Sequence, residues 1–352
     1  MFSDVITTIT REEIIPSVSD TVLKGTPGLL RLLGNSRSWR SGFRLDVPVK
    51  YQKSTAGGIV PVGGTLDTSR TSTRVKMQFN PQRLHKPVVV DDLEVAVNQG
   101  DKRVIELIAV ESASVAQDLV DDLAGYLYTG TGASGSSFDS LINAADDATE
   151  FSSYGSLARA TYTTLDGYYA ASIGALSLAD LSTAQDAVAI GASKPSVALT
   201  TRTIFTAYEA LLQASVQHNA VTTGYPQVTR TGTVPSTQAL GGEIGFSYLA
   251  YRGTPIVADE KCTSQNLFFV TEEHFSYYGI DMGSVGGYMK MTNLNRGNTM
   301  NGPLAMPIPV GYNATEPLRS VNQPAEVTHL YFVGNFVSDN PRYLGRLKGI
   351  TG

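Results

Sequence analysis

Two segments of the chain alternate apolar and polar residues at every second position, which is typical of strands with one covered face. Residues 43–52 and 73–79 place on one side Phe43, Leu45, Val47, Val49, Tyr51, Val75, Met77 and Phe79. The stretch between them, STAGGIVPVGGTLDTS, is too long and too rich in glycine for a tight turn. The pattern therefore predicts a long β-hairpin with a flexible tip.

This hairpin needs support, because a lone two-stranded hairpin is only marginally stable in water. It must lie on the rest of its own chain or on another chain. We expect the face with Val75 and Met77 to contact a neighbouring subunit. If so, Asp at both positions impairs assembly more than it impairs folding of the single subunit.

A second pattern, with apolar residues every three or four positions, covers residues 102–128, where Gly125 is the first Gly or Pro. Its positions include Ile105, Ile108, Leu119 and Leu123. This spacing predicts one amphipathic helix. At about 1.5 Å per residue the helix is close to 40 Å long, so it can serve as a beam across a flat molecule. Residues 87–97 before it predict a short strand and a short helix.

The second half of the chain predicts helices and strands in alternation. A helix is expected over residues 178–190 with Ser177 as its N-cap, then a strand at 197–199 and a helix that starts at Thr200 or Thr201. Residues 218–245 form a long polar loop. Short strands follow at 248–251, 255–257 and 267–270. The strongest strand pattern covers 328–334, with 336–347 as its extension.

Residues 1–40 show neither period clearly, and Gly25, Pro27 and Gly28 interrupt them. We interpret this segment as an arm that crosses a surface and has no core of its own. Near its end is a small basic and aromatic patch, formed by Arg37, Trp39, Arg40 and Arg44. Arginine and tryptophan are favoured in protein interfaces, so contact with another subunit is the preferred interpretation over nucleic acid. The C-terminal group Arg342, Arg346 and Lys348 is interpreted in the same way.

Composition supports an assembly. Hydrophobic residues make up 42% of the 352 residues, which indicates a globular protein, but charged residues make up only 17%. A monomer needs surface charge to stay apart from its copies, whereas a subunit that buries its outside does not. The net charge of −5 argues against general binding of nucleic acid. With one Cys, no signal peptide and no apolar run of ~18 residues, we expect a protein of the reducing cytoplasm and no membrane contact.

A glycine-rich run, GYLYTGTGASGSSFD, contains the spacing Gly130-x-Gly132-x-x-Gly135 of a dinucleotide-binding loop. That fingerprint needs a strand before the glycines and a helix that opens at them. Here a long helix precedes the glycines and no clear helix follows. A nucleotide-dependent soluble enzyme is therefore the weaker alternative. We interpret Gly130, Gly132 and Gly135 as a helix stop and a hinge.

Other reactive residues form no recognisable site. The four histidines, His85, His218, His274 and His329, are far apart in sequence, and Cys262 has no supporting motif. Asp121 and Asp122 are adjacent on the expected helix and so face different directions. We expect no catalytic residue, no bound metal and no cofactor.

The order of these elements resembles the major capsid proteins of tailed bacteriophages, which have the Hong-Kong-97-like shell fold. The matching stretches are the arm TREEIIPSVSDTVLKGTPGLL, the hairpin FRLDVPVKYQ…TRVKMQFNP, the entry PVVVDDLEVAVNQGDKR, the long helix and SFDSLINAADD. The resemblance covers nearly the whole chain. It implies an α+β fold with an N-terminal arm (1–40), an extended loop (41–80), a peripheral domain (81–150 and 286–352) and an axial domain (151–285).

The resemblance also implies the function. Such subunits form pentamers and hexamers, and their shell encloses packaged double-stranded DNA without sequence-specific binding. We expect self-assembly in the host cytoplasm into a virion capsid, with a separate scaffolding protein, a portal and a decoration protein as partners. No covalent crosslink is carried over, because no motif fixes a partner for Lys50 or Lys53. The alternative within the same fold is the shell of an encapsulin-type nanocompartment, which encloses an enzyme.

Overall fold

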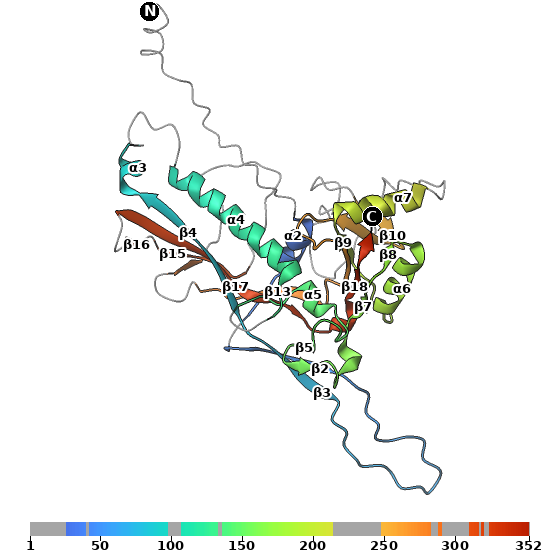
Figure 1. The fold of residues 1–352 in the computed structure, drawn as a ribbon. Coiled ribbons are helices and arrows are strands. Elements are labelled where there is room, and N and C mark those ends of the chain that lie inside the picture. The colour runs from blue at the N-terminus through green and yellow to red at the C-terminus, as the bar shows by residue number, and fades with distance from the viewer. Residues whose placement is uncertain are drawn as a thin grey trace, which may run out of the picture.

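The computed structural model describes residues 26–39, 42–97, 107–132, 136–213, 248–282, 288–290, 310–316, 318–319 and 324–351. These residues form two larger sheets, helices packed on each of them, and a hairpin that projects from the body (Figure 1). The fold is α+β, as the sequence predicts. The statements below concern these residues.

The first sheet is built on one long strand, β17 (Ala325–Ser338). Its order is β1 (Arg37–Ser38), β13 (Phe275–Gly279), β17, β15 (Tyr312–Thr315) and β14 (Tyr288–Lys290). Two further strands pair with β17, namely β16 (Leu318–Arg319) and β4 (Gln82–Asp91). The β4–β17 pairing is antiparallel over ten residue pairs, from Ala325–Asp91 to Gly334–Gln82.

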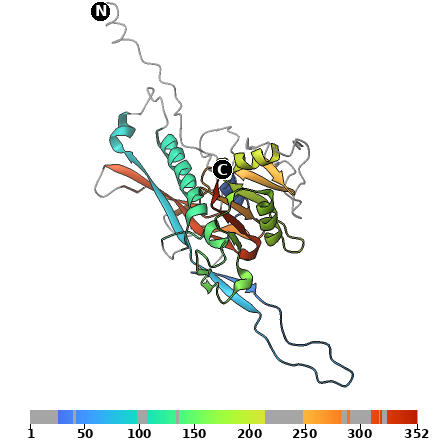
Figure 2. The same ribbon diagram turned by 45° about the vertical axis from the view of Figure 1, so that its right-hand side comes forward.

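The long helix α4 (Leu107–Thr129) lies across β4 and β17 (Figures 1 and 2). Leu119, Leu123 and Leu127 are fully buried in the same core as Val88 and Val90 of β4. The sequence predicts this helix over 102–128; its C-terminal end is confirmed, and residues 98–106 lie outside the described residues. Apolar residues recur along α4 at steps of three and four, so they form one continuous face toward the sheet.

The second sheet has the order β10 (Tyr248–Tyr251), β11 (Thr254–Ala258), β9 (Val197–Thr200), β12 (Asn266–Val270), β18 (Gly345–Lys348) and β7 (Tyr168–Ala170). Helices α6 (Leu178–Val188) and α7 (Arg202–Gln213) pack on it and share its own core of buried apolar side chains. The expected helix–strand–helix unit is thus confirmed. Ser177 caps α6 through a capping box with Asp180, as the sequence predicts.

The expected domain boundaries suggest one sheet for each domain, but two strands do not follow this division. β13 belongs to the first sheet, although residues 151–285 were expected to form the axial domain. β18 belongs to the second sheet, although residues 286–352 were expected in the peripheral domain. The extension of the strongest strand is also wrong in part, because β17 ends at Ser338 and a 3₁₀ turn, η3 (Pro341–Tyr343), leads into β18. The chain therefore crosses between the two sheets three times, from β4 to β7, from β12 to β13 and from β17 to β18.

The end of the expected arm is part of the core, which corrects the interpretation of residues 1–40 for the part that is described. Helix α2 (Pro27–Gly34) buries Leu29, Leu32 and Leu33. Its first turn is held by Asp259, whose carboxylate accepts hydrogen bonds from the Gly28 amide at 3.0 Å and the Tyr128 hydroxyl at 2.9 Å. Residues 1–25 lie outside the described residues.

Shorter elements complete the fold. The hairpin consists of β2 (Leu45–Lys50) and β3 (Arg74–Phe79), and α3 (Asp92–Val97) follows β4. The segment after α4 contains α5 (Leu141–Ala144), β5 (Ser153–Tyr154), β6 (Leu157–Ala158), η2 (Thr163–Leu165) and β8 (Gly174–Ala175). The last strand, β19 (Ile350–Thr351), pairs with β8.

Candidate assembly surface and its anchoring

The hairpin has the predicted register and a firm base. Leu45 pairs with Phe79 and Lys50 with Arg74 in an antiparallel ladder, so alternate residues share a face. One face packs on residues 153–165 of the same chain. The Phe79 and Tyr154 rings meet edge to face at 5.3 Å, and the Gln78 amide donates to the Gly155 carbonyl at 2.8 Å. The body of the chain therefore fixes where the hairpin points.

Met77 belongs to this base, so its expected contact with a neighbouring subunit is wrong. Its side chain is 1% exposed and lies so close to Gly155 that a Cβ on the glycine would be 2.8 Å from the Met77 Cβ. Val75 is half-buried and packs against the same core. The alternating pattern identified the covered face correctly. What covers it comes from residues almost eighty positions away, which periodicity does not reveal.

The loop that joins the two strands, residues 51–73, presents apolar side chains to solvent. Ile59 and Val62 are fully exposed, and Leu66 is 73% exposed. Polar contacts shape the tip: the Asp67 carboxylate accepts from the Gly57 amide at 3.0 Å and the Ser69 amide at 2.8 Å. Exposed apolar groups gathered on a projecting loop are the mark of a surface that another molecule covers. We name residues 54–71 the hairpin tip.

The other expected contact residues have different environments. Trp39 is 4% exposed, and its indole donates to the Gly42 carbonyl at 3.1 Å, so its expected role in a contact between subunits is wrong. Arg44 is exposed beside the hairpin base, and its role stays a prediction. Arg40 lies outside the described residues. Arg346, expected at a surface, is buried within the chain.

The glycine run has the geometry of a tightly closed loop. The Gly130 amide donates to the Tyr126 carbonyl at 3.1 Å, the Thr131 amide to Ser137 at 2.9 Å and the Gly132 amide to the Phe138 carbonyl at 3.0 Å. Each of these three amides already has a partner inside the chain, so none of the three is free to bind a phosphate. The helix-stop role is confirmed, since α4 ends at Thr129.

The hinge role of these glycines stays a prediction, and the loop is closely packed. A Cβ at Gly130 would lie 2.2 Å from the Phe138 carbonyl oxygen, and one at Gly132 would lie 2.3 Å from the Asp139 carboxylate. Gly132 also has a positive φ of 71°, which favours glycine. Gly135 lies outside the described residues. Packing and backbone angle are therefore enough to require glycine at 130 and 132.

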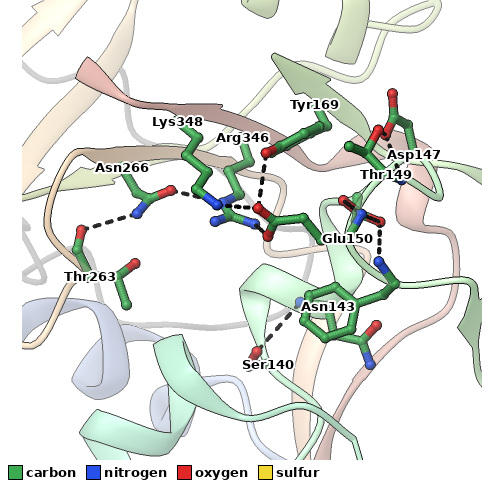
Figure 3. A network of polar contacts seen from close by, with 12 residues as sticks. Ser140, Asn143, Asp147, Thr149, Glu150, Tyr169, Thr263, Asn266, Arg346 and Lys348 are labelled. Atoms are coloured by element: carbon green, nitrogen blue, oxygen red, sulfur yellow. Dashed lines mark hydrogen bonds and ion pairs between the residues drawn. The ribbon is translucent and has the colours of Figure 1, made fainter. Parts of the chain in front are cut away.

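A polar network that the sequence did not predict joins the segment after α5 to the second sheet (Figure 3). Arg346 donates to the Glu150 carboxylate at 2.7 Å and to the Asn266 side chain at 2.8 Å, and Tyr169 donates to Glu150 at 3.0 Å. Lys348 also pairs with Glu150. Burial alone would raise the pKa of Glu150, but its bonds to Lys348 and Arg346 outweigh burial and lower that pKa to about 2. The network therefore stays charged at neutral pH and locks the two segments together.

Reactive chemistry is sparse in the part of the chain that the structure describes. Within it, no three His, Cys, Asp or Glu side chains lie close enough together to hold a metal ion. Burial raises the pKa of the Cys262 thiol well above its ordinary value, which leaves little of the thiolate form. Among the helices described, none is long and apolar enough to cross a membrane. The salient surface feature is thus the projecting apolar tip.

Comparison with known proteins places the fold. No family model and no curated protein matches the chain. Among solved structures, the capsid of cyanophage A-1(L) has a TM-score of 0.73 at 16% identity, covering 99% of both chains. The capsid of a native GTA particle has a TM-score of 0.62 at 11% identity, covering 98% of this chain and 96% of that one. The SrpI encapsulin of Synechococcus elongatus has a TM-score of 0.57 at 10% identity, covering 99% and 95%.

Proposed function

We propose that this chain, which has the Hong-Kong-97-like capsid fold, is the shell subunit of an icosahedral bacteriophage head. The observation that carries the proposal is the likeness to a phage capsid chain over 99% of both chains. The exposed apolar hairpin tip supports it, since a subunit that functions alone has no use for such a projection.

The assembly we propose consists of pentamers and hexamers that close into a shell around double-stranded DNA. In this arrangement the region of the second sheet is the axial domain, and the first sheet with α4 is the peripheral domain. The hairpin is the extended loop over a neighbouring subunit. A separate scaffolding protein, a portal and a decoration protein complete the head, which is assembled in the host cytoplasm and matures from a procapsid. The role of the chain is structural and not enzymatic.

The second candidate is the shell of an encapsulin-type nanocompartment, and the likeness to the SrpI encapsulin supports it. Both candidates use the same fold. They differ in what the shell encloses. We favour the phage head because the likeness to the cyanophage capsid is stronger, at a TM-score of 0.73 against 0.57.

The contents of native particles separate the two candidates. Particles that contain this chain, identified by mass spectrometry, are treated with nuclease, opened, and assayed for DNA and for cargo protein. The phage proposal predicts nuclease-resistant double-stranded DNA of genome length. A protein cargo without DNA would support the nanocompartment instead. A chain found only as a free monomer would contradict both.

A further inference from the structure

The hairpin is a basic element in an acidic protein. Residues 42–80 contain two carboxylates, Asp46 and Asp67, and six cations, namely Arg44, Lys50, Lys53, Arg70, Arg74 and Lys76. Their net charge is therefore +4, and because the whole chain carries −5, all other residues together carry −9. Positive charge is concentrated on the element that projects furthest from the body (Figure 2).

The register of the two strands places Lys50, Arg74 and Lys76 on one face. Val49, Met77 and Phe79 point toward the body and are buried, so the residues that alternate with them point away from it. Lys76 has a partner there, the Asp46 carboxylate at 3.2 Å. Lys50 and Arg74 face each other directly across the strands, and both are exposed. Among the residues that the structure describes, neither forms an ion pair.

Two like charges opposite each other on neighbouring strands destabilise a hairpin. An opposing negative surface would remove that repulsion. Charges of this kind at an interface chiefly set the rate and the specificity of encounter. The Lys50–Arg74 pair is therefore suited to a contact with an acidic partner.

The adjoining tip indicates which class of acidic partner fits. Binding to a phosphate backbone is dominated by cations and hydrogen-bond donors and gives exposed apolar side chains no role. Here the cationic face is followed, further along the hairpin, by the exposed side chains of Ile59, Val62 and Leu66. An apolar centre next to charged residues is the make-up of a protein–protein contact. All residues of this chain outside 42–80 together carry −9, so a second copy offers net charge of the required sign.

We propose that the cationic face of the hairpin, centred on Lys50 and Arg74, binds an acidic surface on a second copy of this chain. The proposal rests on the shell function and adds its electrostatic basis. The apolar tip contributes the buried contact, and the cations steer the approach and fix which surface is met. Because the attraction acts between exposed charges, it weakens as ionic strength rises above about 0.15 M, where the screening length is ~8 Å.

The test compares two doubly reversed variants of the full chain. Lys50→Glu with Arg74→Glu reverses the cationic face, and Lys194→Glu with Arg202→Glu makes the same change of net charge at exposed positions elsewhere. Light scattering follows assembly at low and at high salt, and thermal melting checks each fold. We expect the hairpin variant to fold normally and to assemble on the order of tenfold more slowly at low salt, with the difference shrinking at high salt. The control should assemble nearly as the wild type does.

Several results would overturn the proposal. Assembly of the hairpin variant at the wild-type rate would show that this face meets no second copy. Normal assembly with weaker binding of DNA fragments would identify nucleic acid as the partner instead. If the wild-type chain forms no assembly under any condition, the shell function itself fails and this contact fails with it. The first two results leave the shell function standing, so the two failures are distinguishable.

Discussion

Asp139 is a buried carboxylate at the point where α4, α5 and β17 meet. The Asn335 amide donates to it at 2.8 Å and the Asn143 amide at 3.2 Å. Burial raises the pKa of Asp139 to about 6, although both amide bonds lower it. The folded chain therefore holds this proton more tightly than the unfolded chain, whose Asp has a pKa near 3.8.

The sign of the resulting pH dependence follows from this difference. Stability contributed by Asp139 is fully present below pH 3.8 and is lost as the pH rises through about 6. The free energy of unfolding of the wild type minus that of Asp139→Asn should therefore fall by about 3 kcal/mol between pH 3.5 and 7.5. Urea unfolding at a series of pH values measures this difference. A difference that stays constant over the whole range would show that Asp139 does not titrate as described.

Gly130 and Gly125 provide a matched pair at the end of α4. A Cβ at Gly130 meets the Phe138 carbonyl oxygen at 2.2 Å, whereas a Cβ at Gly125 meets nothing within 4 Å. Gly130→Ala should destabilise the subunit by about 1–3 kcal/mol, because the backbone must move. Gly125→Ala should stabilise it by about 0.5–1 kcal/mol, because alanine is the better helix former. Chemical denaturation of the single subunit measures both, and equal effects would contradict the packing described.

At the scale of elements, substitutions at two places in the hairpin should distinguish an effect on folding from an effect on assembly. Met77→Asp places a charge in the core of the subunit and should reduce the yield of folded protein, since Met77 is 1% exposed. Ile59→Ser with Val62→Ser changes only fully exposed side chains, so the subunit should melt as the wild type does and assemble poorly. Circular dichroism and size-exclusion chromatography measure the two effects. Normal assembly of the Ile59 and Val62 variant would show that the tip is not a contact.

Patterns in the sequence predicted the elements whose formation depends on residues close together in the chain. The alternation in β2 and β3, the long apolar stripe of α4 and the cap at Ser177 each depend on residues a few positions apart, and all three are confirmed. Helix α2 was missed because Pro27 and Gly28 resemble loop residues. In the structure Pro27 takes the first helical position, where proline is favoured.

Pairings over long distances in sequence could not be predicted in the same way. Gly155 lies against Met77, and Glu150 binds Arg346 almost two hundred residues away. No period or spacing encodes such a pair. The exposed tip was within reach of sequence reasoning, because GGIVPVGG puts apolar residues between glycines where no strand can bury them. Recognising the tip as a candidate contact required the structure, which shows that Ile59 and Val62 are fully exposed.

At the scale of the whole molecule, the contacts are directional. The tip and the cationic face lie on the hairpin, which projects from the body (Figure 1), and the residues outside 42–80 carry a net charge of −9. In the proposed shell, one copy offers its hairpin to a different surface of the next copy. Contacts between two different surfaces generate closed rings when the rotation closes. Rings of five and six such subunits are the units from which a closed icosahedral shell is built.

Sedimentation velocity combined with cryo-electron microscopy of the purified chain, with a scaffolding protein where one is needed, tests the shell function most directly. The account predicts closed particles of megadalton mass that contain pentamers and hexamers, with the hairpin of each subunit lying over its neighbour. A well-folded chain that remains a monomer under every condition, including in the presence of scaffold, would contradict it.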